Sequence, residues 1–263
     1  MYMKKFFLTI TKKMGLLPYL HVLREKYFPG KYYKNALLEG HKYEQFYSQF
    51  ITKGDMVFDI GAHKGHRTGI FLALGAKVVA VEPQKDCYKY LQFKYGKSIR
   101  LENCGIGGKE GIQEMFINNA SSLSTFSKEW VEEAKSGRFS DTKWIDKKWI
   151  EIKTLDVLIE KYGTPKFCKI DVETYEYEVL KGLSSNIEFI SFEFMMPESF
   201  DILKNCLNHI IKLDLSAEFN YCISDNLKLE LKHWIGSDRI DDFLNEKIFS
   251  SSSWGDIYIK MKK

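Results

Sequence analysis

A short apolar segment that ends in a glycine-containing loop and passes directly into a helical pattern is the feature that most constrains this chain. Residues 56–60 form the apolar segment, Gly61 and Gly65 punctuate the loop, and residues 66–74 have a helical pattern. A second apolar segment, rich in valine, covers residues 77–82. Strand, helix and strand at this spacing predict two parallel strands joined by a crossover helix, which is the unit of an α/β sheet.

The same alternation returns along the rest of the chain. We predict further helices at 84–95, 154–162, 175–183 and 198–213, and further strands at 99–104, 167–171, 187–194, 219–224 and 256–261. A chain of 263 residues is long enough for one such domain. The predicted fold is an α/β, Rossmann-like domain with a seven-stranded, mostly parallel sheet and helices on both faces.

Two segments fall outside this alternation. Residues 1–52 form a predicted N-terminal helical segment of two or three short helices, and residues 53–263 form the α/β domain. Within that domain, residues 118–147 are polar, contain a serine-rich run and two tryptophans, and are too long for a tight connection. We expect this insertion to act as a lid over an acceptor-binding site.

Composition limits the partners of the chain. A net charge of +4 without a dense basic run gives no reason to expect nucleic acid. No apolar stretch approaches the ~20 residues of a membrane span. The basic, aromatic N-terminus favours a helical arm packed on the domain over a peripheral membrane contact. The five cysteines are scattered and form no Cys-x-x-Cys pair, which favours reduced side chains and a cytoplasmic location.

The loop after the first predicted strand has the features of a ligand-binding turn. It runs from Asp59 through Gly61, Ala62 and His63 to Gly65. Glycines permit a tight turn and let a ligand lie against bare backbone, and the helix that follows presents unpaired N–H groups to an anion. We expect that anion to be the carboxylate of a methionine moiety, with Asp59 accepting hydrogen bonds from an ammonium group or from loop amides. A purely structural turn is the alternative.

The ends of the next two predicted strands add to this site. Glu82, followed by Pro83, lies about twenty residues after the glycine turn, where an acidic side chain can accept both ribose hydroxyls of an adenosine. Asn103, Cys104 and Gly105 follow the third strand, where bare backbone or an amide can bind an adenine edge. The alternatives are a helix-capping role for Glu82 and a plain turn at 103–105.

Two other nucleotide-binding motifs do not fit the loop. His63 stands where the second glycine of a dinucleotide-binding loop would be, and residues 61–68 lack the Gly-Lys-Ser/Thr of a phosphate-binding loop. An NAD-dependent oxidoreductase is the alternative enzyme, and the missing glycine disfavours it. A catalytically silent module that binds the cofactor is the alternative from another class.

Together these segments resemble the FkbM family of class I S-adenosylmethionine-dependent methyltransferases. The resemblance rests on Val57-Phe-Asp-Ile-Gly-Ala62 with Gly65, Val81-Glu-Pro83, Thr154-Leu-Asp-Val-Leu158, Lys169-Ile-Asp-Val-Glu173 with Glu176, Val179-Leu-Lys-Gly182, and Trp254-Gly-Asp-Ile-Tyr258. It extends from about residue 53 to the end of the chain. It implies S-adenosylmethionine as the cofactor, and in-line transfer of its methyl group to a hydroxyl of a sugar, glycan or natural-product acceptor.

Two positions depart from the family's usual pattern. Thr174 stands where the family usually has glycine after Asp-Val-Glu, and His63 stands where it usually has asparagine. Both lie where cofactor and acceptor are expected to meet.

Two carboxylates at the end of the fourth predicted strand are the expected catalytic residues. We expect Asp171 to face the sulfonium of the cofactor and Glu173 to act as general base or to orient the acceptor. A helix-capping role is the alternative for Glu173. Glu193, His63 and His66 are further candidates for the base. Because no two histidines have the i, i+4 spacing of helical metal ligands, we expect no metal site and a metal-independent reaction.

Overall fold

The computed structural model of the chain describes residues 17–27, 31–137, 139–246, 249 and 253–262. Most of the N-terminal stretch that bears on membrane contact, residues 1–16, lies outside these described residues. Among the helices that are described, none combines the length and the apolar character that a membrane crossing demands.

The main sheet is mostly parallel, as predicted. Within the described residues it has eight strands in the order β10-β9-β11-β8-β7-β1-β2-β3. Their bounds are β1 Met56–Ile60, β2 Lys77–Val81, β3 Ile99–Glu102, β7 Phe167–Ile170, β8 Phe189–Met195, β9 Glu218–Ile223, β10 Ile235–Gly236 and β11 Trp254–Lys260. The five neighbouring strands β3, β2, β1, β7 and β8 pair in parallel. Strand β11 pairs antiparallel with β8 and β9. The predicted count of seven strands was wrong by one, because the two-residue strand β10 is too short to leave a periodic pattern.

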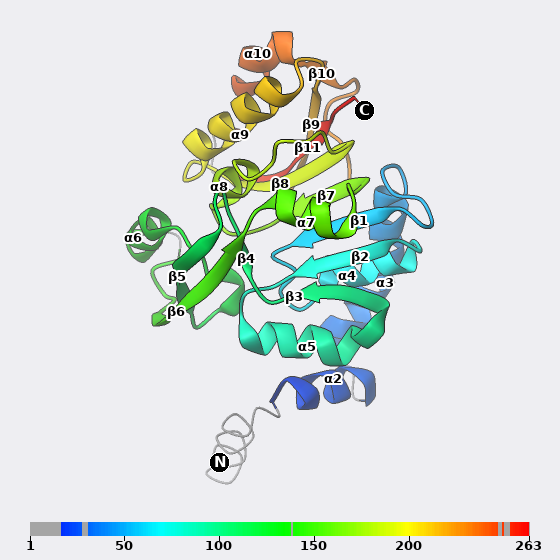
Figure 1. The fold of residues 1–263 in the computed structure, drawn as a ribbon, viewed down its shortest axis with the longest axis vertical. Helices are drawn as coiled ribbons and strands as arrows, with labels where there is room; N and C mark the ends of the chain where they lie inside the picture. The colour runs from blue at the N-terminus through cyan, green and yellow to red at the C-terminus, as the bar shows by residue number, and fades with distance from the viewer. Residues whose placement is uncertain (1–16, 28–30, 138, 247–248, 250–252, 263) are drawn as a thin grey trace.

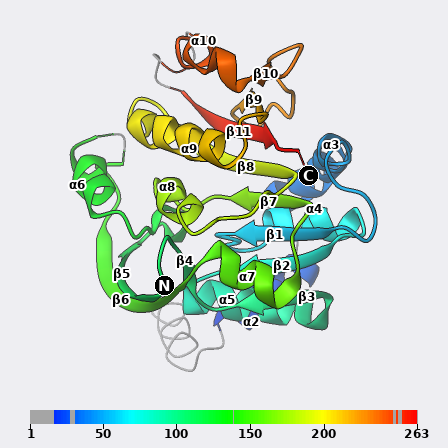
Figure 2. The same ribbon diagram turned by 45° about the horizontal axis from the view of Figure 1, so that its top comes forward.

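Helices cover both faces of this sheet (Figures 1 and 2). The structure contains two hydrophobic clusters, one on each face. One face is covered by α3 (Lys31–Tyr47), α4 (His66–Ala73) and α5 (Lys85–Tyr95). The other is covered by α7 (Leu155–Tyr162), α8 (Glu176–Leu180) and α9 (Phe200–Leu213), with α10 (Ile240–Leu244) near the β9 end. The strands are therefore buried on both sides, which accounts for their continuous apolar sequences.

The end of the predicted N-terminal segment is part of the domain core. Tyr43, Phe46, Tyr47 and Phe50 are buried in the cluster beneath the sheet, and the rings of Phe50 and Tyr258 stack at 5.2 Å. Ahead of them, α2 (Leu17–Tyr27) packs along α5 (Figure 1). A domain boundary at residue 52 therefore does not coincide with a break in packing.

A second, three-stranded sheet stands at the carboxyl ends of the main strands (Figure 1). Its order is β4-β6-β5, with bounds β4 Gly105–Ile106, β5 Gly111–Asn118 and β6 Trp144–Lys153. The predicted insertion at 118–147 contains the 3-10 turn η2 (Ser121–Leu123) and helix α6 (Lys128–Ser136). Trp130 of α6 is buried, with its ring 5.6 Å from that of Trp144. The insertion is thus a folded unit with its own packing.

Glu102 at the end of β3 joins this second sheet to α7. Its carboxylate accepts hydrogen bonds from Lys161 Nζ at 2.5 Å, Tyr162 Oη at 2.5 Å and Lys153 Nζ at 2.9 Å. Burial alone would raise the pKa of Glu102, but these three donors outweigh it and lower the pKa to about 2. The stabilisation is therefore present above the ordinary pKa of a glutamate and is lost as pH falls toward 2.

We expect Glu102→Gln to lower the free energy of unfolding at pH 7 by about 1–2 kcal/mol, a value reduced because Lys161 is largely exposed to solvent. Urea denaturation at pH 7 measures the loss. The same comparison at pH 3 should give a smaller difference, since the unfolded wild-type chain binds a proton at this side chain at that pH and part of the stabilisation is lost. An equal difference at both pH values would contradict the assignment.

Candidate functional site

The carboxyl ends of β1, β2 and β7 enclose two adjoining cavities. The first, called here the Glu82 cavity, has a volume of about 40 Å³ and is lined by Gly61, His63, Glu82, Pro83 and Gln84 together with residues from 115–126 and 171–173. The second, the Asp59 cavity, has a volume of about 260 Å³ and includes Asp59, Ala62, Lys64 and Glu193. The two share walls formed by Gly61, His63, Asp171 and Glu173. Most of the predicted site residues thus lie around one continuous region.

The glycine loop makes a tight turn, and both of its glycines have positive φ angles. Gly61 has φ +82°, and a Cβ atom added to it would lie 1.9 Å from the backbone oxygen of Asp171. Gly65 has φ +72°, and its Cβ would lie 2.6 Å from side-chain atoms of Leu91 and Tyr95. Both positions require glycine because the chain packs closely against itself in a left-handed conformation. This close packing explains why side chains are absent at Gly61 and Gly65, and contact with a ligand would be an additional role.

Glu82 is the residue that ties this loop to β2. Its buried carboxylate accepts the backbone N–H of His63 through Oε2 at 2.8 Å and that of Gln84 through Oε1 at 2.7 Å. Burial raises its pKa to about 7, although the two amide hydrogen bonds oppose that rise. Each oxygen keeps a second lone pair, so the carboxylate can still accept two hydroxyl hydrogens from a ligand in the cavity. This arrangement suits the vicinal hydroxyls of a ribose.

The raised pKa of Glu82 predicts how stability depends on pH. Between the ordinary glutamate pKa of 4.5 and its folded value of about 7, the unfolded chain has lost this proton while the folded chain keeps it. Folding stability from this group therefore falls as pH rises through that window, by about 3 kcal/mol in total. Glu82→Gln cannot titrate, so the stability of this variant relative to wild type should rise between pH 5 and pH 8. Urea denaturation at both pH values tests this, and a constant difference would disprove it.

Asp59 forms the floor of the larger cavity at the end of β1. It is 2% exposed, and Thr68 Oγ1 of α4 donates a hydrogen bond of 2.5 Å to its Oδ2. Burial raises its pKa to about 6, opposed by that hydrogen bond and by Lys169. Above that pH the side chain presents a negative charge to the Asp59 cavity, which suits a ligand ammonium group.

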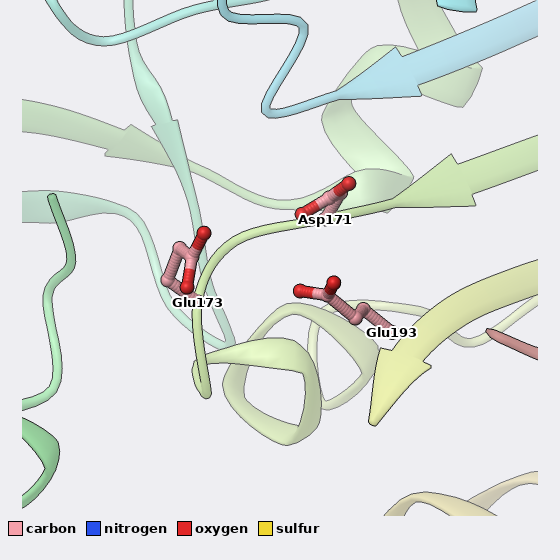
Figure 3. A group of neighbouring side chains, drawn as sticks. All are labelled: Asp171, Glu173 and Glu193. Atoms are coloured by element: carbon pink, nitrogen blue, oxygen red, sulfur yellow. The ribbon is translucent and has the colours of Figure 1, made fainter. Parts of the chain in front are cut away.

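Three carboxylates converge at this site, two from the loop after β7 and one from β8 (Figure 3). One oxygen each of Asp171, Glu173 and Glu193 lies within 4.8 Å of the other two. Oε2 of Glu173 is inaccessible to solvent and has no hydrogen-bond partner in the described part of the chain. Burial, followed by the charge of Asp171, raises the pKa values of Glu173 and Glu193 well above the ordinary range. Carboxylates at this spacing attract a cation, whether a metal ion or a cationic group of a ligand, and the expected metal independence stays a prediction.

The loop after Asp171 contains two consecutive non-glycine residues in the left-handed region. Glu173 has φ +55° and Thr174 has φ +65°. Thr174 is 8% exposed and its hydroxyl has no hydrogen-bond partner within the described residues. A β-branched side chain is disfavoured in this conformation. The departure from glycine at this position therefore has a structural cost.

We expect Thr174→Gly to raise the free energy of unfolding by about 1 kcal/mol, since it removes both the left-handed strain and the unpaired hydroxyl. Thr174→Ala keeps a Cβ atom and should gain less. Urea denaturation of the three proteins gives the order, and a destabilised glycine variant would show that Thr174 is not strained.

The two histidines of the loop differ in their surroundings. Burial, followed by the charge of Lys64, lowers the pKa of His63 to about 4, so this ring is neutral at pH 7. Its Nε2 lies 2.8 Å from Oγ of Ser121 in η2. His66 begins α4, and its ring lies 5.2 Å from that of Tyr43.

Four of the predicted residues line neither cavity. Gly65, Asn103, Cys104 and Gly105 are all absent from both walls. Nδ2 of Asn103 donates to the backbone oxygens of Glu82 at 2.8 Å and Pro83 at 3.1 Å, which supports the end of β2. Cys104 is buried in the core, and a Cβ on Gly105 would lie 2.6 Å from Phe126. Their roles in this structure are in packing and support.

The turn η2 covers the Glu82 cavity and supplies residues that the sequence pattern does not assign to it. Nε2 of Gln84 donates to the backbone oxygen of Ser121 at 2.8 Å, and Oγ of Ser124 donates to Oε1 of Gln84 at 3.3 Å. The remaining 40 Å³ holds only a few water molecules. A nucleoside bound at Glu82 would therefore lie against η2. The serine-rich run predicts a lid, but over the acceptor, whereas this turn lies over the predicted cofactor residues.

Comparison with known proteins adds a family to these observations. A protein-family model described as "Methyltransferase FkbM domain" matches residues 59–221. A comparison with curated proteins found no match. Among solved structures, the chain is similar to a TehB-like SAM-dependent methyltransferase from Corynebacterium glutamicum (11% identity, 84% of this chain and 88% of that chain covered, TM-score 0.44). It is also similar to a candidate methyltransferase from Streptococcus mutans in complex with SAH (12% identity, 83% and 95% covered, TM-score 0.43).

Proposed function

Because the chain belongs to the FkbM methyltransferase family, we propose that it methylates a hydroxyl oxygen of a small-molecule or saccharide acceptor. S-adenosylmethionine is the cofactor. When bound, it supplies a methyl group on a positively charged sulfur, and the acceptor oxygen takes this group by in-line displacement.

The residues around the two cavities fit this cofactor. Glu82 would bind the ribose hydroxyls through its free lone pairs while its two amide hydrogen bonds keep the loop in place. Asp59 would accept from the amino group of the methionine part. Glu173 has a buried Oε2 without a hydrogen-bond partner among the described residues and lies close to Asp171 and Glu193, and this arrangement suits a cationic neighbour.

The same carboxylates are the proposed catalytic groups. We assign to Asp171 the position facing the sulfonium and to Glu173 that of general base. A hydroxyl must lose its proton as it attacks, and a carboxylate whose pKa is raised by burial and by like charges is a stronger base than an ordinary glutamate. General base catalysis of this kind contributes about 10²–10⁴-fold.

A third cavity beside Thr174 offers a route for the acceptor. It has a volume of about 560 Å³ and is lined by Phe126, Tyr175 and Tyr177 together with the start of α6. Aromatic side chains of this kind can pack against the apolar face of a sugar ring. We therefore assign two parts to the proposed lid at 118–147: residues 121–126 lie over the cofactor, and residues 127–129 lie beside the acceptor.

The proposal depends on one observation above all. The buried carboxylate of Glu82 and the convergent carboxylates of Asp171 and Glu173 share the walls of one cavity. A ligand with vicinal hydroxyls at one end and a positive charge at the other matches that arrangement. NAD has hydroxyls of the same kind, but its pyrophosphate would meet these acidic groups with like charge.

Isothermal titration of the purified protein with S-adenosylmethionine, S-adenosylhomocysteine and NAD tests the proposal. We expect the first two to bind and NAD to give no heat, whereas NAD binding alone would favour the oxidoreductase. Transfer of radiolabelled methyl groups should then be measured on a panel of sugars and polyols, with and without EDTA. Incorporation into hydroxyls that EDTA does not reduce is the expected result. Cofactor binding without transfer to any acceptor would favour the silent module.

A further inference from the structure

A buried lysine lies directly behind the three convergent carboxylates of the site. We call this group, Asp171, Glu173 and Glu193, the acidic wall. Lys169 of β7 is 1% exposed, and its ammonium donates to Oδ1 of Asp256 at 2.9 Å and to Oδ2 of Asp171 at 3.5 Å. A third hydrogen bond, of 3.3 Å, reaches the backbone oxygen of Ile170. Lys169 lines neither of the two cavities at the site. It can therefore act on a ligand only through its neighbours.

The sheet register accounts for the position of the lysine. Lys169 is paired with Asp59 of β1 on one side and with Ser191 of β8 on the other, and residues opposite one another in a sheet share a face. Two residues beyond Ser191 on β8, Glu193 is paired with Asp256 of β11. The C-terminal strand thus places Asp256 on the sheet face of Lys169 and Asp171, although Asp256 is 87 residues from Lys169 along the chain.

Negative charge surrounds this ammonium. The carboxyl groups that act on it or on its neighbours come from strands β1, β8 and β11, the loop after β7 and helix α8: Asp59, Asp171, Glu173, Glu176, Glu193 and Asp256. From the helices that cover this face, Tyr47 of α3 and Arg67 of α4 contribute. Burial favours the neutral amine, but Asp171 and Asp256 outweigh it and raise the pKa of Lys169 above its ordinary value. Lys169 is therefore a fixed positive charge.

We propose that Lys169, anchored by Asp256, is a positioning residue that holds the Asp171 carboxylate in place at the cationic end of the cofactor. The inference rests on the proposed function, because it requires the sulfonium to lie beside Asp171. Without a fixed cation, the mutual repulsion of Asp171, Glu173 and Glu193 would be relieved by further proton uptake within this group, and a group with less negative charge would attract the sulfonium less. The chain itself thus supplies the counter-charge that this acidic wall needs.

The experiment compares S-adenosylmethionine with S-adenosylhomocysteine, which lacks the methyl group and the charge on sulfur. Isothermal titration between pH 5.5 and pH 8.5 gives the ratio of the two affinities. That ratio isolates the contribution of the charged sulfonium group to binding. In the wild type it should fall as pH decreases through the ionisation of the acidic wall. In Lys169→Met the midpoint of this pH dependence should move up by about 1–3 pH units, with a loss of the ratio of about fivefold or more at the wild-type midpoint.

Two further variants separate charge from structure. Asp256→Asn breaks the same ion pair but removes a negative charge, so its midpoint should move down. Lys169→Arg keeps the positive charge and should restore the wild-type midpoint. Circular dichroism checks that each variant is folded, and the direction of the Asp256→Asn shift tests the proposal even if Lys169→Met does not fold.

The outcomes are distinguishable from a failure of the proposed function. If the wild type binds neither ligand, the proposed function and this inference both fall. If both ligands bind, but Lys169→Met and Asp256→Asn weaken them equally with no movement of the midpoint, Lys169 is merely structural. An upward shift in Asp256→Asn would also overturn the proposal.

Discussion

Replacing Gly61 with alanine should cost the protein at least ~4 kcal/mol of folding free energy, which is an exceptional loss for a single substitution. The added Cβ would lie 1.9 Å from the backbone oxygen of Asp171, and a backbone atom beside a central strand cannot move aside as a side chain does. The left-handed φ of +82° adds about 1 kcal/mol of strain. Urea denaturation measures the loss, which is a large part of the roughly 5–15 kcal/mol typical of a domain.

Gly54→Ala is the matched control for this prediction. Gly54 also has a left-handed conformation, with φ +94°, but no atom lies within 4 Å of an added Cβ. This variant should lose only about 1 kcal/mol. If the two alanine variants lose equal stability, close packing between β1 and the end of β7 is not what requires glycine at position 61.

Glu82→Gln should weaken binding of S-adenosylhomocysteine about 100-fold. The substitution replaces charge-assisted hydrogen bonds to the ribose with weaker neutral ones, and a net loss of about 3 kcal/mol for the pair corresponds to a factor of this size. The amide also has only one oxygen, so it can accept from His63 or from Gln84 but not from both, and the loop loses part of its support. Isothermal titration at pH 8, where the wild-type side chain is ionised, measures the change in Kd.

Glu102→Gln is the control for that measurement. It makes the same substitution at the end of the adjacent strand, where the carboxylate binds lysines and a tyrosine away from both cavities. It should reduce stability and leave Kd within about twofold of wild type. A Kd for the Glu82 variant within threefold of wild type would mean that Glu82 does not contact the cofactor.

The main sheet could be predicted from sequence because its strands are buried on both faces. Continuous apolar runs such as 56–60 and 77–82 are typical of buried parallel strands when each is followed by a helix of the right length. The second sheet could not be predicted in this way. Ile112 of β5 and Trp149 of β6 are each 73% exposed, so these strands lack the regular alternation of buried and exposed residues that marks a half-buried strand.

Part of the candidate site could likewise be predicted from sequence, and part could not. Asp59, Glu82 and Asp171 can be identified from sequence because the carboxyl ends of parallel strands meet at one edge, a property of the fold class. The contact of Ser121 with His63 and that of Lys169 with Asp256 join segments 58 and 87 residues apart. Such contacts depend on how an insertion and a late strand pack, and no local pattern encodes them.

The central place of β11 affects how a growing chain can fold. This strand lies between β8 and β9, although β9 precedes it in the sequence. During synthesis, therefore, the outer edge of β8 stays open after β9 has left the ribosome, and it closes only when residues 254–260 emerge. An open apolar edge readily pairs with other chains. Chaperone demand and aggregation should thus concentrate in the interval before β11 arrives, and fragments that end before residue 254 should remain in that vulnerable state.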